Sequence, residues 1–262
     1  MKQSKELRVA IVSAKAAGKI IMRHYGHLHH IKVKSARLGI VTEADFEAQK
    51  KIKAVIRKSF PDAVFLAEED KKHQKVSNAK IWVVDPLDGT NNFSRGLKLF
   101  AVSIALVKNK KPVLGVVFDP ATGDLFFAEK GKGAFLNGKR IRVSGVARTR
   151  NAVFDIPLSI REGMRANGML VLKKLMKQLG TIRILGAAAL RLSFIASGRL
   201  DAYIEQGTYA WDVAAGILIL EEAGGKVSDE KGKQFGLFSA NRQTIVASNG
   251  KIHAQIIREL NK

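Results

Sequence analysis

One stretch of the chain decides its fold, namely WVVDPLDGTNNF at residues 82–93. Residues 81–84 are β-branched or aromatic, which predicts a buried strand, and Pro86 removes a backbone donor, which predicts that the strand ends there. Asp85 and Asp88 are therefore expected at the carboxyl end of a strand, where open α/β sheets bind ligands. Two carboxylates and a carbonyl are oxygen ligands that a hard cation such as Mg²⁺ prefers. The stretch therefore suggests a metal site.

The two residues that follow suggest an anion site beside it. Gly89 lets the backbone approach a ligand closely, and free N–H groups at the start of the helical turn at Thr90 can receive a phosphate. The same residues also describe an ordinary turn, because Asp, Pro and Gly dominate turns for backbone reasons alone. Taken by itself, the stretch leaves a ligand site and a plain turn equally open.

Length and composition limit the class of protein. The chain has 262 residues, of which 46% are hydrophobic and 26% charged, which predicts a soluble globular protein with a substantial core. The absence of cysteine excludes disulfides, thiolate metal sites and cysteine catalysis. No apolar stretch approaches the ~18 residues that span a bilayer, and the N-terminus lacks the pattern of a secretion signal. We therefore expect a cytoplasmic protein without membrane contact.

The charge is strongly basic, with 45 Lys and Arg against 23 Asp and Glu, a net charge of +22. Such a surface attracts polyanions, and nucleic acid is the obvious candidate. The basic residues are nevertheless scattered, without a zinc pattern, an arginine-rich tail or an aromatic-basic RNA signature. Attraction for phosphorylated metabolites explains the charge at least as well, so no specific nucleic-acid partner is expected.

Hydrophobic periodicity predicts a mixed α/β chain. The first half is expected to have helices at 4–25 and 43–60, and strands at 64–67, 101–107, 113–118 and 124–129. The last three strands are separated by short turns, which predicts an antiparallel meander. Helices and strands then alternate, which is typical of α/β units. The elements expected there are helices at 162–179, 187–197 and 212–223, strands at 181–185, 200–205 and 244–248, and a last helix from 251.

Acidic residues at the ends of other predicted elements could join Asp85 and Asp88. Glu68 follows the strand at 64–67, and Asp212 precedes a helix that is apolar nearly all round. Asp212 is also a plain N-cap candidate, although a buried cap could bind a cation as well. Asp45 has a local interpretation too, as the first-turn acid of a helix capped by Thr42. The histidines at 24, 27, 29 and 30 complete no zinc pattern, and nucleophile-elbow, Walker A and dinucleotide motifs are absent.

Six segments of the chain share an order and spacing that local structure does not explain. They are VTEAD at 41–45, AEE at 67–69, the stretch at 82–93, GAAA at 186–189, WDVAAG at 211–216 and EAGG at 222–225. Each motif is weak alone, but the set in this order and spacing is highly specific. Over nearly the full length, the chain resembles the Mg²⁺-dependent inositol monophosphatase family of the sugar-phosphatase superfamily.

The resemblance implies a site for two or three Mg²⁺ ions. Carried over by position, one ion is held by Glu68, Asp85 and the Leu87 carbonyl, and a second by Asp85, Asp88 and Asp212. Glu68 and Thr90 are implied to orient the attacking water, with Asp45 accepting the Thr90 hydroxyl proton and Lys34 close by. The groups implied to bind the substrate are Gly89, Thr90, Gly186, Ala187, Ala188, Glu205 and Asp212.

The fold implied by the resemblance is a layered αβαβα sandwich. Residues 1–262 would form a single compact catalytic domain with two lobes. The first lobe, 1–150, would carry helices, an antiparallel sheet and most metal ligands. The second, 151–262, would be an α/β lobe with Asp212 and the substrate-contacting residues. A homodimer is also implied.

The implied activity is hydrolysis of a small polyol or sugar phosphate, with myo-inositol 1-phosphate as the leading substrate. Fructose-1,6-bisphosphatase activity, alone or as a second activity, is the nearest alternative. Nucleotide 3′-phosphatase activity is less favoured because residues 91–93 lack a lysine after Gly-Thr. A basic, nucleic-acid-associated protein that keeps the fold is the alternative from another class.

The chain departs from the family pattern around the substrate side of the site. Gly96, Leu97 and Lys98 stand where the family usually has a proline after its motif, and Ala187 occupies a position often filled by serine or threonine. Arg191 is also unusual after the small residues that precede it. The metal ligands are all present, so these departures concern the identity of the substrate rather than hydrolysis itself.

Overall fold

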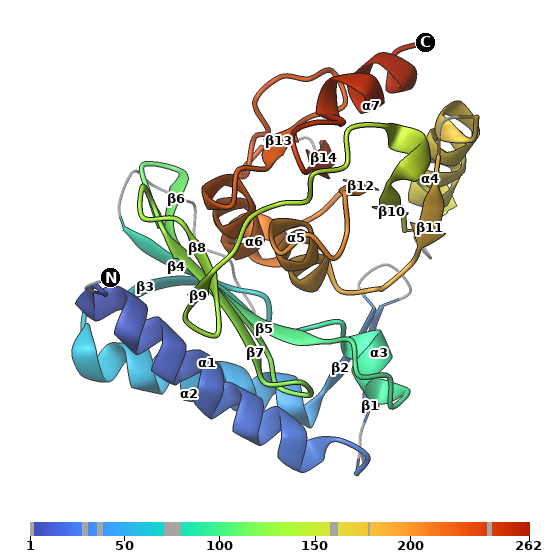
Figure 1. Ribbon diagram of the computed structural model, residues 1–262. Coiled ribbons are helices and arrows are strands. Elements are labelled where there is room, and N and C mark those ends of the chain that lie inside the picture. The colour runs from blue at the N-terminus through green and yellow to red at the C-terminus, as the bar shows by residue number, and fades with distance from the viewer. Residues whose placement is uncertain are drawn as a thin grey trace.

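The computed structural model describes residues 3–27, 31–35, 39–70, 80–157, 162–177, 179–239 and 243–262. Helices and sheets alternate in five layers (Figure 1). Two helices cover one face of a seven-stranded sheet, two more lie between that sheet and a five-stranded one, and the last two cover the far face. The predicted mixed α/β sandwich is therefore confirmed. Within the described ranges, no helix is both long and apolar enough to cross a membrane.

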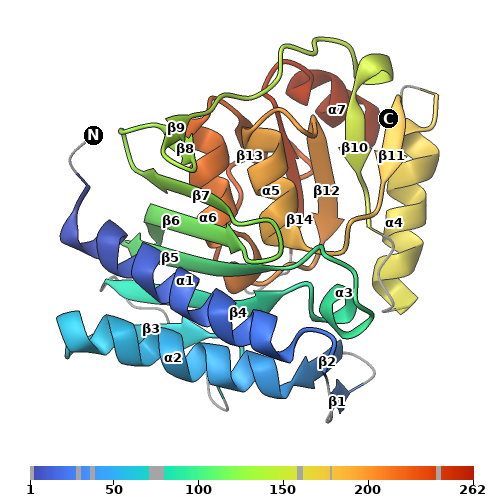
Figure 2. The same ribbon diagram turned by 60° about the horizontal axis from the view of Figure 1, so that its bottom comes forward.

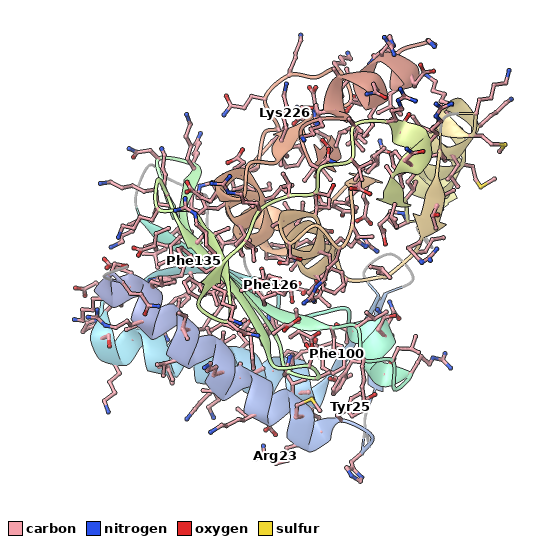
Figure 3. All side chains as sticks on the ribbon, in the orientation of Figure 1. Arg23, Tyr25, Phe100, Phe126, Phe135 and Lys226 are labelled. Atoms are coloured by element: carbon pink, nitrogen blue, oxygen red, sulfur yellow. The ribbon has the colours of Figure 1, made fainter. Side chains whose placement is uncertain are left out.

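The first layer consists of α1 (Lys5–His24) and α2 (Glu43–Ser59), which lie side by side (Figure 2). The Ser4 side chain caps α1 by accepting a hydrogen bond from the Leu7 N–H, and Thr42 is the N-cap of α2. At the other end of α1, Tyr25 packs on Phe100, with ring centroids 5.5 Å apart (Figure 3). Both predicted helices are confirmed, because amphipathic stripes and caps are local signals.

The seven-stranded sheet has the order β3-β4-β5-β6-β7-β8-β9. Only β3 and β4 are parallel; every other neighbouring pair is antiparallel, so the predicted meander is confirmed. Its strands are β3 (Val64–Ala67), β4 (Ile81–Asp88), β5 (Ala101–Lys108), β6 (Lys111–Asp119), β7 (Asp124–Glu129), β8 (Ala134–Leu136) and β9 (Lys139–Arg140). A separate antiparallel ribbon, β1 (Ile31–Ser35) with β2 (Gly39–Thr42), lies near the short helix α3 (Thr90–Ser94) (Figure 2).

The prediction that Pro86 ends its strand is wrong, because β4 continues to Asp88. Pairing with β3 stops at Val84, and pairing with β5 is irregular between Asp85 and Asp88. Pro86 therefore falls where its missing N–H interrupts no regular ladder, which is where sheets tolerate proline. The irregular end of β4 consequently holds both aspartates inside the sheet.

The middle layer consists of α5 (Ala188–Ala196) and α6 (Ala210–Glu222). Most residues of α6 are buried, as its continuous apolar sequence predicts. The backbone of α6 lies directly on the seven-stranded sheet, since a Cβ added to Gly115 of β6 would come within 2.5 Å of the Ala215 carbonyl oxygen. The Ser103 hydroxyl of β5, in register with Asp85, donates to the Trp211 carbonyl at 3.3 Å, which places the first turn of α6 beside the end of β4.

The five-stranded sheet has the order β11-β10-β12-β14-β13 and mixes parallel with antiparallel pairs. Its strands are β10 (Val153–Asp155), β11 (Thr181–Arg183), β12 (Ala202–Gln206), β13 (Lys226–Ser228) and β14 (Thr244–Ser248), and its outer helices are α4 (Glu162–Leu175) and α7 (His253–Leu260). A 3₁₀ turn, Thr149–Asn151, precedes β10. β10 and β13 were not predicted, because three residues give too short a pattern. The last helix begins two residues later than expected, since Asn249 Oδ1 accepts the N–H groups of Lys251 and Ile252 in a turn.

His253 ties α7 to the five-stranded sheet. The ring is buried, with Nδ1 2.9 Å from the Ser248 hydroxyl and Nε2 2.8 Å from the Ser228 hydroxyl. Burial lowers the pKa of His253 to about 4, and the positive charge of Lys226 contributes in the same direction. The folded protein therefore keeps this imidazole neutral where an exposed histidine becomes charged.

Acidification is expected to destabilise the protein through His253. Between pH 6.5 and 4 the unfolded chain binds a proton at this residue that the folded chain does not. This residue's stabilisation is complete above pH 6.5 and is lost as the pH falls toward 4, by up to about 3 kcal/mol. Urea unfolding from pH 7 to 4.5 measures the loss. His253→Gln should flatten this dependence, whereas His27→Gln, at an exposed position, should leave it intact. An unchanged slope in His253→Gln would contradict the assignment.

Candidate active site

Four carboxylates meet where the end of β4 faces α6. Glu68 follows β3, Asp85 and Asp88 belong to β4, and Asp212 lies in the first turn of α6. Burial raises the pKa of Asp85 well above its usual range, and the charges of Glu68, Asp88 and Asp212 raise it further. Glu68 and Asp212, which are more than a hundred positions apart in the chain, are therefore both close enough to Asp85 for their charges to repel it.

Asp85 and Glu68 are joined by a side-chain hydrogen bond, which also raises the pKa of Asp85. Two backbone contacts hold the pair in place. The Glu68 N–H donates to the Val84 carbonyl at 3.1 Å, and the Leu87 N–H donates to Asp85 Oδ1 at 3.0 Å. The parallel pairing of β3 and β4 thus delivers both acids to the same edge of the sheet.

Asp88 links β4 to the first turn of α5. Its Oδ1 accepts the Ala188 N–H at 3.0 Å, and its Oδ2 accepts the Ala189 N–H at 2.7 Å. Burial raises the pKa of Asp88 to about 7, although these two hydrogen bonds and the Arg191 charge oppose the shift. The carboxylate is therefore fixed at the positive end of a helix dipole.

Asp212 is not the N-cap of its helix, contrary to one interpretation of the sequence. Tyr209 is the N-cap, and Asp212 lies three residues on, where its Oδ2 accepts the Tyr209 N–H at 2.8 Å. An acid at this third position can bond back to the cap, so the helix starts earlier than the aspartate. Burial raises the pKa of Asp212 well above its usual range, and the Glu68 charge adds to the shift.

Asp45 connects a helix cap to the acidic cluster. It is fully buried, and its Oδ2 accepts the Thr42 N–H at 2.8 Å and the Thr42 hydroxyl at 2.6 Å. Its Oδ1 lies 3.2 Å from the Thr90 hydroxyl, which is also 2.9 Å from the Leu87 carbonyl oxygen. Burial raises the pKa of Asp45 to about 7, against the bonds from Thr42. The capping role is confirmed, and the same carboxylate also contacts Thr90.

Gly89 stands in the left-handed region, with φ +89°. A Cβ there would lie 2.7 Å from the Leu99 carbonyl oxygen and 3.1 Å from the Ala187 Cβ, so the position needs glycine for space as well as conformation. Asn92, which sequence reasoning missed, braces the same region by donating from Nδ2 to the carbonyl oxygens of Leu99 at 2.8 Å and Leu185 at 2.6 Å. No local signal identifies this role, because one acceptor, Leu185, lies 93 residues further along the chain.

The predicted substrate-side residues lie along the first turn of α5 and on β12. Gly186 has φ +78°, Ala187 is the N-cap of α5, and Ala188 is its first residue. Glu205 lies on β12, and its charge raises the pKa of Asp212, which places it beside the acidic cluster. The Lys34 side chain lies outside the described residues, so its predicted role stays a prediction.

A buried ion cluster behind these residues was also missed. Arg191 of α5 contacts Asp155 and Glu205, and the Tyr203 hydroxyl donates to Glu205. The sequence marked Arg191 only as unusual. Asp155 carries no distinguishing signal because β10 is too short to predict, and the strand predicted at 200–205 does not indicate which side chain the Tyr203 hydroxyl contacts.

The donor chemistry of the cluster fits Mg²⁺. Its side chains are carboxylates, and buried like charges need a counter-charge. As placed in the part of the chain that the structure describes, no three His, Asp or Glu side chains form a ready-made metal site. Asp88 and Asp212 accept backbone N–H groups instead. A carboxylate has about four lone-pair sites, so both keep acceptor capacity for an ion.

Comparison with known proteins gives a consistent result. The family model described as "Inositol monophosphatase family" matches residues 2–262. The chain is 38% identical to the fructose-1,6-bisphosphatase/inositol-1-monophosphatase of Thermotoga maritima, over 98% of this chain and 96% of that one. It is 40% identical to the Nus factor SuhB of Xylella fastidiosa, over 88% of this chain and 84% of that one. The crystal structure of the extragenic suppressor protein suhB from Bartonella henselae superposes with a TM-score of 0.91 at 37% identity, covering 99% of both chains.

Proposed function

Because the chain belongs to the inositol monophosphatase family, we propose that it is a Mg²⁺-dependent phosphomonoesterase that hydrolyses a small polyol or sugar phosphate. The observation that carries this proposal is the buried acidic cluster around Asp85, whose charges repel one another without a cation. Myo-inositol 1-phosphate is the leading substrate. Fructose 1,6-bisphosphate is the alternative, and the name of the Thermotoga maritima relative covers both activities.

Five groups would hold Mg²⁺, and they surround the end of β4. They are the side chains of Glu68, Asp85, Asp88 and Asp212 and the carbonyl of Leu87. When bound, Mg²⁺ lowers the pKa of water and neutralises charge on the leaving alkoxide. The resemblance implies two or three ions, and this number stays a prediction.

The chain's own groups would position the reactants around that site. Asp45 can accept the Thr90 hydroxyl proton, which would turn a Thr90 lone pair toward a water molecule that Glu68 also contacts. The backbone N–H groups of Gly89 and Thr90 would bind the phosphate. The alcohol part of the ester would then lie toward the first turn of α5 and Glu205. The water would attack in line with the leaving oxygen, and no phosphoenzyme would form.

A substrate panel tests this proposal. We expect phosphate release with Mg²⁺ from myo-inositol 1-phosphate, fructose 1,6-bisphosphate and a nucleoside 3′,5′-bisphosphate, with the highest kcat/KM for the first. The nucleotide should lag by at least about tenfold, the cost of one mismatched polar contact. Asp88→Asn serves as the inactive control. If no ester releases phosphate at any Mg²⁺ concentration, the enzyme proposal fails.

A second candidate function is association with a polyanion such as RNA. The net charge of +22 and relatives named Nus factor SuhB at similar identity favour it. Under this alternative, RNA affinity should fall steeply with salt and survive Asp88→Asn, whereas that substitution should abolish hydrolysis. The two functions are thus separable in one pair of proteins. The homodimer implied by the resemblance stays a prediction.

A further inference from the structure

Arg191 is a buried cation next to the candidate active site. Its side chain is only 4% exposed, and arginine is almost never buried unless it is paired. It lies on α5, one turn beyond the backbone N–H groups that hold Asp88.

Two carboxylates and a ring surround the Arg191 guanidinium. Nη1 donates to Glu205 Oε2 at 2.9 Å. Nε forms an ion pair with Asp155 Oδ1 at 3.0 Å that is not aligned as a hydrogen bond. The guanidinium also lies over the Tyr203 ring, 5.1 Å from its centroid. Arg191 thereby ties α5 to both β10 and β12.

Asp155 is anchored from its other side. Its Oδ2 accepts the Leu185 N–H at 2.8 Å, just before the turn that leads into α5. The Asp155 side chain is fully buried, as is the Tyr203 ring. The guanidinium is therefore held by partners that are themselves fixed, and it can transmit that rigidity to Glu205.

Glu205 is the member of this cluster that reaches solvent, with 24% of its side chain exposed. Its Oε2 accepts hydrogen bonds from both Arg191 and the Tyr203 hydroxyl. Among the described residues, no donor bonds to the other oxygen, Oε1. One oxygen is thus held from inside, and the other is left as an acceptor beside the acidic cluster.

We propose that Arg191 is a positioning residue that fixes Glu205 Oε1 as the acceptor for a hydroxyl group on the alcohol part of the substrate. This inference rests on the proposed function, and it adds Arg191 as a residue that positions the group binding the alcohol part. A neutral polyol offers hydroxyl donors, and an ionised carboxylate oxygen held in one orientation binds such a donor strongly.

Stability alone does not explain this arrangement. A buried ion pair contributes little net stability compared with apolar residues of similar volume. Apolar side chains could equally well pack α5 on β12, but they would leave Glu205 free to rotate. The cluster instead places two donors on one oxygen of its most exposed carboxylate, which is the arrangement expected of a support for a binding group.

Arg191→Met tests the inference because the effect should fall on KM rather than on kcat. A general loss of packing would change both. We expect KM for myo-inositol 1-phosphate to rise by about tenfold to a hundredfold, the size of one charge-assisted hydrogen bond, while kcat falls less than about threefold. The inhibition constant of inorganic phosphate, which lacks the alcohol part, should change far less than KM. Release of free inositol provides the assay.

Arg199→Met is the matched control. Arg199 also pairs with a carboxylate, Asp124, at 2.6 Å and stacks on Phe126. It follows the C-terminal end of α5, whereas Asp88 bonds to the N-terminal end of that helix. The ratio of KM to the phosphate inhibition constant should stay at the wild-type value in this variant. A tenfold change in that ratio in Arg199→Met would overturn the assignment of the effect to Glu205.

Tyr203→Phe keeps the test decisive if Arg191→Met does not fold. This variant removes only the hydroxyl that donates to Glu205 Oε2 and keeps the ring under the guanidinium. We expect KM to rise by about threefold to tenfold, as for a single hydrogen bond. A wild-type KM in this variant, or in soluble Arg191→Met, would overturn the inference and leave the proposed function standing. A wild-type protein that hydrolyses no polyol phosphate would overturn both.

Discussion

Asp85→Asn is expected to lower kcat/KM by at least about a thousandfold. Asp85 is the proposed ligand shared by both ions, and bound metal supplies several kcal/mol of transition-state stabilisation. An amide is neutral and a weaker ligand, so the substitution should act through lost Mg²⁺ affinity. Steady-state kinetics over a wide range of Mg²⁺ concentrations measures the loss.

The same variant should be at least as stable as the wild type when Mg²⁺ is absent. Burial and the charges of Glu68, Asp88 and Asp212 disfavour an ionised Asp85, so the amide removes a repulsion. Sites built for binding commonly carry such a stability cost. Thermal unfolding with and without Mg²⁺ should therefore show a large increase in Tm for the wild type and little for the variant.

Asp119→Asn is the matched control for Asp85→Asn. Asp119 is also a buried aspartate with a raised pKa, but its Oδ1 accepts the N–H groups of Ala121 and Thr122 in the turn after β6. We expect this variant to keep kcat/KM within about threefold and the wild-type response of Tm to Mg²⁺. A fully active Asp85→Asn would be incompatible with the two-metal assignment.

Gly89→Ala is expected to destabilise the protein by about 2–5 kcal/mol. Part of the loss, about 1–2 kcal/mol, comes from forcing a residue with a Cβ to adopt φ +89°. The rest, about 1–3 kcal/mol, comes from the clash of that Cβ with the Leu99 carbonyl oxygen, 2.7 Å away. Because the clash pushes apart the turn that would bind the phosphate, kcat/KM should fall as well. Urea unfolding and kinetics measure the two effects.

Gly123→Ala separates strain from clash. Gly123 has φ +80°, close to that of Gly89, but a Cβ there would meet nothing within 4 Å. This control should therefore lose only the conformational part of the stability and keep its activity. Equal losses of stability in the two variants would show that Gly89 is needed for its backbone conformation alone.

Several parts of the fold and site could be predicted because their signals are local. The stripe of α1, the capping pair Thr42 and Asp45, and the meander from β5 to β7 each depend on residues that are neighbours in the chain. The resemblance to the family added the list of metal ligands. It compares the order and spacing of motifs along the whole chain, which no pattern within a short segment reveals. Pro86 shows the limit, since whether a proline ends a strand depends on where its neighbouring strands stop.

By itself, the sequence determined the class of fold and the acidic residues at the element ends, because periodicity, caps and turns are properties of short segments. Only the tertiary structure decided that Asp88 binds the first turn of α5 and that Asn92 braces Leu185. It also places Asp45 Oδ1 3.2 Å from the Thr90 hydroxyl, a contact that the resemblance implied. It also brought Arg191, Asp155 and Glu205 together. These contacts join residues that are distant in the chain, and only the packing of the layers sets the distances between them.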